Sequence, residues 1–132
     1  MSCTWRADRT RVAEPFATHV TALLDADPGE WIITCGAREA AVELAGYEAY
    51  LADPTQPKFT NPGNSAHCTV PALAVDVTLV AGDSDDWDYT DVAWRRLVAA
   101  VNASAHLHSL DGICDTDHIE ATNWRALRTV AA

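Results

Sequence analysis

The chain has 132 residues, of which 48% are hydrophobic and 21% are charged, and it contains no low-complexity tract and no internal repeat. This length and composition predict one folded domain with its own hydrophobic core, which excludes an intrinsically disordered protein and a solenoid. With 19 acidic and 9 basic residues the net charge is −10, so we expect no binding to nucleic acid or to an anionic membrane surface.

The hydropathy of the sequence does not indicate a membrane protein. The N-terminal residues 1–12 lack the apolar core of a signal peptide. The most apolar stretch, 71–81, is too short to cross a membrane and is interrupted by Asp76. We therefore expect synthesis in the cytoplasm and no membrane-embedded part.

Helical and extended patterns alternate in the first half of the chain. Apolar residues at helical spacing predict a helix over 15–26, with Pro15 in its first turn. A short β-rich run follows at 31–34, and the alanine-rich segment 37–52 predicts a second helix. Segment 53–66 contains three prolines and a glycine, so we expect a long loop of the kind that often carries function. The residues of the second helix expected to face inward are Val42, Ala45 and Leu51.

The clearest strand covers residues 73–80. Its alternation places Asp76 on the face opposite Val75 and Val77, so the carboxylate need not enter the main core. An acidic loop at 82–88 is followed by a predicted helix, two strand-like segments and a closing helix, at 90–103, 105–110, 114–120 and 121–130. Three or four helices beside a small, mostly antiparallel sheet predict an α+β fold, with residues 1–132 forming a single domain.

Three residues of types suited to zinc are separated widely in the sequence. His67, Asp76 and His118 would supply the three protein ligands that a catalytic zinc typically takes. Asp115 precedes His118 by three residues and would serve as the general base. Glu120 follows His118 by two residues, returns to the same face of a strand, and would orient the histidine. The spacing alone leaves open that these residues never meet.

Two other clusters of side chains contain residue types that bind metals. His106 and His108 would share one face of a strand, either as metal ligands or as a hydrogen-bonded pair that lines the substrate pocket. The acidic run at 83–88 resembles the start of a calcium loop but lacks its glycine and its final acidic ligand, so a solvated turn is favoured. No nucleophile elbow, phosphate-binding loop or dinucleotide motif occurs.

The four cysteines show no Cys-x-x-Cys spacing, which disfavours a thiolate zinc site and a thioredoxin-type redox pair. Free buried thiols are expected for a chain without a signal peptide, although the sequence leaves disulfide pairing open. The residues concerned are Cys3, Cys35, Cys68 and Cys114.

The order of the candidate residues resembles a known family. Ser65-Ala66-His67, Ala74-Val75-Asp76 and Asp115-Thr116-Asp117-His118-Ile119-Glu120 follow one another along the chain, with Gly36 and Arg38 upstream. This order is similar to that of the zinc D-alanyl-D-alanine carboxypeptidase (VanY-like) family, which includes the L-alanyl-D-glutamate peptidases of phage endolysins. The likeness covers residues 12–124. The interval from His67 to Asp76 is nine residues, two more than in the family motif, and the motif's glycine is absent.

The resemblance implies a fold, a cofactor and residue roles. The fold would be that of the D-Ala-D-Ala carboxypeptidase and hedgehog domains. Zinc would be held by His67, Asp76 and His118, with Asp115 as the base. Arg38 would stabilise the oxyanion or bind a substrate carboxylate. Ser65 would hydrogen-bond the substrate or a ligand, and the extra two residues after His67 would bulge outward, because an insertion of two preserves strand phase.

The function implied is a zinc metallopeptidase that cleaves an amide bond in the peptide stem of peptidoglycan, as a carboxypeptidase or an endopeptidase. We expect a monomer without a separate cell-wall-binding domain. A phage endolysin, made in the cytoplasm and released to act at the cell wall, fits these expectations. The alternatives are a metal hydrolase with another substrate, an inactive peptidoglycan-binding module and a phage structural protein.

Overall fold

A six-stranded sheet organises the residues that this computed structural model describes, which are 2–81, 84–86, 92–110 and 115–131. The strand order is β1-β2-β3-β6-β5, with β4 paired to the end of β3. Only β1 and β2 are parallel to each other, which confirms a mostly antiparallel sheet. The strands are β1 (Ser2–Trp5), β2 (Glu30–Cys35), β3 (Ala74–Ala81), β4 (Ser84–Asp86), β5 (Leu107–Leu110) and β6 (Asp115–Ala121).

Four α-helices lie within the described ranges, so the α+β prediction with three or four helices is confirmed. None of them is long and apolar enough to cross a membrane. The helices are α1 (Phe16–Ala26), α2 (Ala40–Ala52), α3 (Val92–Ala103) and α4 (Trp124–Ala131), and the 3-10 turns are η1 (Arg9–Arg11), η2 (Pro62–Asn64) and η3 (Ala66–Cys68).

Two short strands were not predicted. β1 pairs with β2 at the edge of the sheet, and β4 lies in the acidic segment that was expected to be a loop. Both are held by backbone pairing to a longer neighbour, which requires no apolar pattern of their own. Strands of three or four residues are therefore too short to be predicted from side-chain periodicity.

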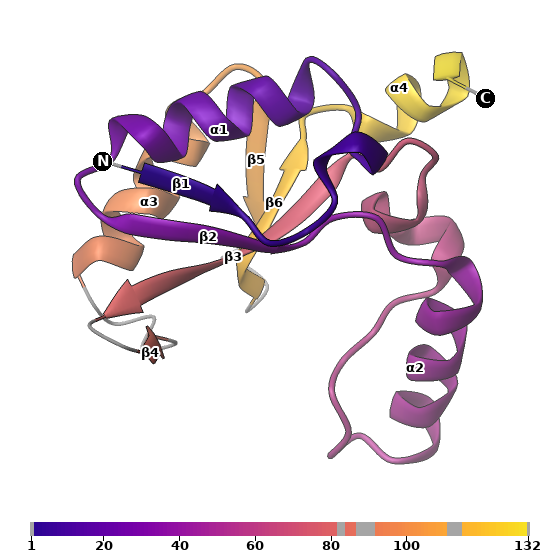
Figure 1. Ribbon diagram of the computed structural model, residues 1–132. Helices are drawn as coiled ribbons and strands as arrows, with labels where there is room; N and C mark the ends of the chain where they lie inside the picture. Colours follow the sequence, from indigo (N-terminus) through magenta and orange to yellow (C-terminus); the bar gives the residue numbers. More distant parts are fainter. Residues whose placement is uncertain (1, 82–83, 87–91, 111–114, 132) are drawn as a thin grey trace.

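Helices α1 and α3 lie together on one side of the sheet, whereas α2 stands apart at one end of it (Figure 1). Trp31 of β2 and Trp94 of α3 are fully buried and meet edge to face, with their ring centroids 5.0 Å apart. Val75 and Val77 are buried as well. Because successive strand residues alternate between faces, Asp76 points away from this helix-covered core, as predicted.

A partly buried ion pair ties α1 to α3. Asp27 ends α1 and accepts hydrogen bonds from Arg96 at 2.6 and 2.9 Å, from the Trp31 indole at 2.9 Å and from the Gly29 backbone at 2.7 Å. These contacts, the Arg96 hydrogen bond first among them, outweigh burial and lower the pKa of Asp27 from 3.8 to about 2. The carboxylate therefore stabilises the fold above about pH 4, and that contribution is lost as the pH falls towards 2.

We expect Asp27→Asn to lower the free energy of unfolding by about 2 kcal/mol at neutral pH, because the amide cannot keep the charged pair. The difference from the native protein should shrink between pH 4 and pH 2, where the native carboxylate takes up its proton. Urea unfolding at several pH values measures this difference. A gap that stays constant down to pH 2 would contradict the assignment.

The prediction of the inward face of α2 is wrong. Val42 and Leu51 are 56% and 60% exposed, and Glu43 is the buried residue of this helix. The helix packs on the returning loop: a side chain at Gly46 would come within about 2.5 Å of the Phe59 ring, so glycine lets the loop approach. Apolar residues occur all round α2, and the tertiary partner, rather than helical periodicity, decides which side is covered.

Candidate metal centre

A row of three side chains crosses the sheet on the face away from α1 and α3. Asp76 of β3 is paired with His118 of β6 on one side and with Cys35 of β2 on the other. Directly paired residues of antiparallel strands present their side chains on the same face, about 5 Å apart. The sheet itself thus brings a carboxylate, an imidazole and a thiol together.

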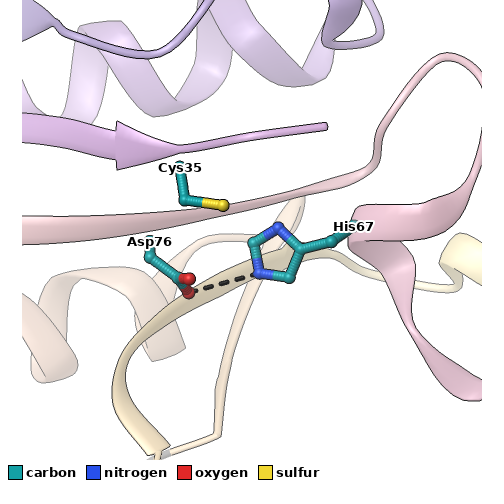
Figure 2. Close-up of side chains that lie close together, drawn as sticks. All are labelled: Cys35, His67 and Asp76. Atoms are coloured by element: carbon teal, nitrogen blue, oxygen red, sulfur yellow. Dashed lines mark hydrogen bonds and ion pairs between the residues drawn. The ribbon is translucent and has the colours of Figure 1, made fainter. Parts of the chain in front are cut away.

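His67 joins this row from η3, which lies beside β3. Its Nδ1 atom is 2.7 Å from the carbonyl oxygen of Gly36, and its own carbonyl accepts the backbone N–H of Arg38 at 2.9 Å. The side chain is 4% exposed, so its position is set by the surrounding chain. Figure 2 shows the Cys35 sulfur and the Asp76 carboxylate directed towards the His67 ring.

The connection between His67 and β3 turns outward. The Leu73 N–H donates to the Ala66 carbonyl at 2.9 Å, which closes the turn, and the Thr69 hydroxyl lies 2.9 Å from the Pro71 carbonyl oxygen. Val70 at the tip is 85% exposed. The turn therefore projects to the surface, and Asp76 lies on the strand face away from the core.

The three donor atoms predicted to hold zinc form a nearly equilateral triangle. His67 Nε2 lies 3.2 Å from Asp76 Oδ1 and 3.2 Å from His118 Nδ1, and the latter two atoms are 3.4 Å apart. Ligand atoms 2.0–2.1 Å from a tetrahedral zinc are separated by about 3.3–3.4 Å. The residues present therefore fit a zinc ion in both donor type and spacing.

The opposite nitrogen of each histidine already has an acceptor. His67 directs Nδ1 at the Gly36 carbonyl, and His118 directs Nε2 at the Glu120 carboxylate, 2.9 Å away. When these nitrogens carry the proton and donate it, His67 Nε2 and His118 Nδ1 are left as lone pairs facing the centre of the triangle. Such outer hydrogen bonds are typical of histidines that bind metals.

We expect Glu120→Ala to weaken zinc binding by roughly 10- to 100-fold, because His118 loses the acceptor that fixes its tautomer. Competition with a chromophoric chelator measures the dissociation constant. Glu120→Gln keeps an acceptor oxygen and should lose less, and Glu48→Ala removes an exposed carboxylate of α2 as a control. An unchanged dissociation constant in Glu120→Ala would show that Glu120 does not orient a ligand.

Arg38 contacts the Asp76 carboxylate through the oxygen that faces away from the donor triangle. Its Nη2 atom lies 3.4 Å from Asp76 Oδ2 and 3.4 Å from Cys35 Sγ, and its Nη1 lies 3.1 Å from Glu43 Oε2. Glu43 is 1% exposed, and the Phe59 ring lies 5.2 Å from the guanidinium carbon. Arg38 is therefore fixed on several sides, and it holds the Asp76 carboxylate with one oxygen turned towards the histidines.

His67, Asp76 and His118 shift one another's pKa values. Burial by itself would lower the pKa of His67 and of His118, but the adjoining Asp76 carboxylate raises both. Burial would raise the pKa of Asp76, and its contacts with the two histidines hold it well below its usual range. Protons and a metal ion therefore compete for the same lone pairs.

The other predicted residues lie at different places. Ser65 is buried immediately before η3. His108 is paired with Glu120 across β5 and β6, one strand beyond His118, and is exposed. His106 lies before β5, and its ring stacks on His19 of α1 at 4.0 Å instead of joining the donor triangle. The two histidines are thus not brought together as a pair.

Asp115, the predicted base, is the first residue of β6, and its side chain lies outside the described part of the structure. Its proximity to the donor triangle therefore stays a prediction.

Cys35 is the residue beside the donor triangle for which the sequence predicted no role. Cys35 offers Sγ within 4.8 Å of ligand atoms of both His67 and Asp76. Burial would raise the pKa of its thiol, but the hydrogen bond with His67 and the charges of His67 and Arg38 lower it. Among the described cysteines, Cys3, Cys35 and Cys68 are free thiols, as expected, but they are partly and not fully buried; Cys114 lies outside the described residues. The sequence offered one hint, the position of Cys35 just before the Gly36 and Arg38 that resemble the family.

Comparison with known proteins establishes the fold. No protein-family model matches the sequence, and no curated protein matches it either. Among solved structures, the L-Ala D-Glu endopeptidase ChiX of Serratia marcescens matches with a TM-score of 0.66 over 90% of this chain and 86% of its own, at 16% sequence identity. At this identity the likeness shows a shared fold, and the predicted fold class is confirmed by a peptidase of known structure.

Proposed function

We propose that this protein is a zinc-dependent peptidase that cleaves an amide bond in the peptide stem of bacterial peptidoglycan. The observation that carries the proposal is the donor triangle of His67, Asp76 and His118, whose edges of 3.2–3.4 Å suit tetrahedral zinc. The fold supports the choice of substrate, because the chain shares it with an L-Ala D-Glu endopeptidase. Whether the bond is D-Ala-D-Ala or L-Ala-D-Glu depends on the substrate pocket.

Zinc bound to the triangle would supply a Lewis acid for the scissile carbonyl and for the attacking water. Around it, the chain's own residues have distinct tasks. Glu120 orients His118, and the backbone carbonyl of Gly36 orients His67. Asp115 is proposed to take the proton of the attacking water and to pass it to the leaving amine.

Arg38 is proposed to act in two ways. Its contact with Asp76 Oδ2 holds the carboxylate in place. Its side chain is 21% exposed, and its permanent positive charge would stabilise negative charge that develops on a nearby substrate oxygen. Ser65 and His108 are proposed to contact the substrate, Ser65 from the turn before His67 and His108 from the strand beside β6. We propose that the protein acts on this substrate at the cell wall.

Mass spectrometry of muropeptides after digestion with zinc-loaded protein tests the proposal, because the mass lost identifies the bond. Loss of one alanine indicates a carboxypeptidase, whereas separation of the stem after its first residue indicates an L-Ala-D-Glu endopeptidase. Chelator-treated protein and His67→Ala are the controls. A zinc-loaded protein that leaves every muropeptide mass unchanged would contradict the proposed activity.

A non-catalytic peptidoglycan-binding module is the second candidate, and the position of Cys35 favours it. A thiol beside His67 and Asp76, two of the three proposed ligands, would complete a closed, four-ligand site of the structural type if it also bound the metal. Binding of the protein to purified peptidoglycan without any change in muropeptide masses would support this alternative.

A further inference from the structure

A β-bulge places Cys35 in the row of metal-binding side chains. Ile33 of β2 is paired with Val77 of β3, but the next pair joins Cys35, instead of Thr34, with Asp76. One extra residue on β2 thus shifts the register just before the candidate metal centre. Bulges of this kind occur next to active sites, where they redirect a side chain.

The redirected thiol lies among groups that suit a ligand. Cys35 Sγ is within 4.8 Å of one ring nitrogen of His67 and one carboxylate oxygen of Asp76, and Arg38 Nη2 lies 3.4 Å from it as a partner for negative charge. The close-up shows the sulfur on the side of the His67 ring and of the Asp76 carboxylate (Figure 2). In a tetrahedral zinc site a thiolate sulfur lies about 3.5–3.6 Å from the nitrogen and oxygen ligands, so the present separation of at most 4.8 Å calls for a shift of Sγ of about 1 Å on binding.

We propose that Cys35 is a fourth protein ligand of the metal held by His67, Asp76 and His118. This inference rests on the metal centre of the proposed function and adds a thiolate to it. On binding, the S–H bond breaks, its proton passes to solvent, and the sulfur lone pair forms the metal bond. The donor set becomes two imidazoles, one carboxylate and one thiolate.

A fourth protein ligand has two consequences. Thiolate favours zinc over magnesium and manganese, which prefer oxygen donors, so the site gains selectivity. It also closes the position that a catalytic zinc keeps open, so the resting site is protected until the sulfur withdraws. Arg38, which already contacts both Cys35 and Asp76, is placed to hold the thiolate when it withdraws.

Cobalt(II) substitution tests the proposal, because cobalt bound to thiolate gives a ligand-to-metal charge-transfer band in the near ultraviolet that nitrogen and oxygen ligands do not give. The native protein, loaded with one equivalent of Co²⁺, should show this band together with the visible bands of four-coordinate cobalt. Cys35→Ser should keep the visible bands and lose the charge-transfer band. The matched control, Cys68→Ser, removes the half-buried cysteine next to His67 and should keep both.

Zinc affinity is the second readout. The dissociation constant for zinc should be higher in Cys35→Ser than in the native protein. Loss of a residue that only orients a ligand raises this constant roughly 10- to 100-fold, and loss of a ligand should raise it by at least as much. Native protein that binds one Co²⁺ without the charge-transfer band, or a band that persists in Cys35→Ser, would overturn the role of Cys35 while leaving the His67, Asp76 and His118 site intact. Native protein that binds no Co²⁺ would instead overturn the proposed function itself.

Discussion

His67→Ala and His118→Ala should each purify with almost no zinc, whereas the native protein should hold about one equivalent after zinc loading. Each histidine contributes one corner of a triangle whose edges are 3.2–3.4 Å, and two remaining ligands hold a metal weakly. Peptidase activity should fall by more than about 10³-fold, because the metal supplies several kcal/mol of transition-state stabilisation. Metal analysis by mass spectrometry and a muropeptide assay measure the two effects.

His106→Ala is the matched control for metal content. It also removes an imidazole, but this ring stacks on His19 of α1 and is not part of the donor triangle. The variant should keep its zinc, and circular dichroism should show that all three variants remain folded. Zinc retained in His118→Ala would rule out the proposed centre, and zinc lost in His106→Ala would mean that the second histidine cluster supplies a ligand.

Asp115→Ala should keep its zinc and lose about 10²- to 10⁴-fold in turnover, the usual contribution of a positioned general base. Asp115 begins β6 three residues before His118, on the strand that carries the ligand. The rate is measured under saturating substrate, and metal content is determined on the same preparation. A variant that keeps its zinc but loses turnover identifies a base, whereas a variant that loses both identifies a ligand.

Asp117→Asn is the control for Asp115, since it alters the other aspartate of β6, which directly precedes His118. We expect a much smaller effect on turnover. The opposite pattern, with zinc lost in Asp115→Ala and retained in His67→Ala, would show that the base and a ligand have been exchanged in our assignment.

Local sequence patterns were sufficient for the main strands and helices. The alternation in β3 correctly predicts that Asp76 leaves the core face on which Val75 and Val77 lie, because strand periodicity is a property of the backbone alone. The spacing of His118 and Glu120 likewise predicts that they share a face, and their 2.9 Å contact agrees. These features depend on neighbours two residues apart.

Features that depend on tertiary partners were predicted less well. Helix α2 was recognised from its composition, yet its exposed Val42 and Leu51 were expected to be buried. Arg38 was expected to face the substrate, and the structure shows it also bound to Asp76 and to the buried Glu43. A side chain's partner across 38 residues of chain is not encoded in local periodicity.

By itself, the sequence determined which donor atoms are available for a metal and on which face of their strands Asp76 and His118 lie. Only the tertiary structure decided that His67 Nε2, Asp76 Oδ1 and His118 Nδ1 meet at zinc-like distances, and that Cys35 stands beside them. The physical reason is that these distances depend on strand register. The pairing of β2 with β3 contains a bulge and the pairing of β3 with β6 joins segments about 40 residues apart, so their geometry follows from long-range packing instead of local spacing.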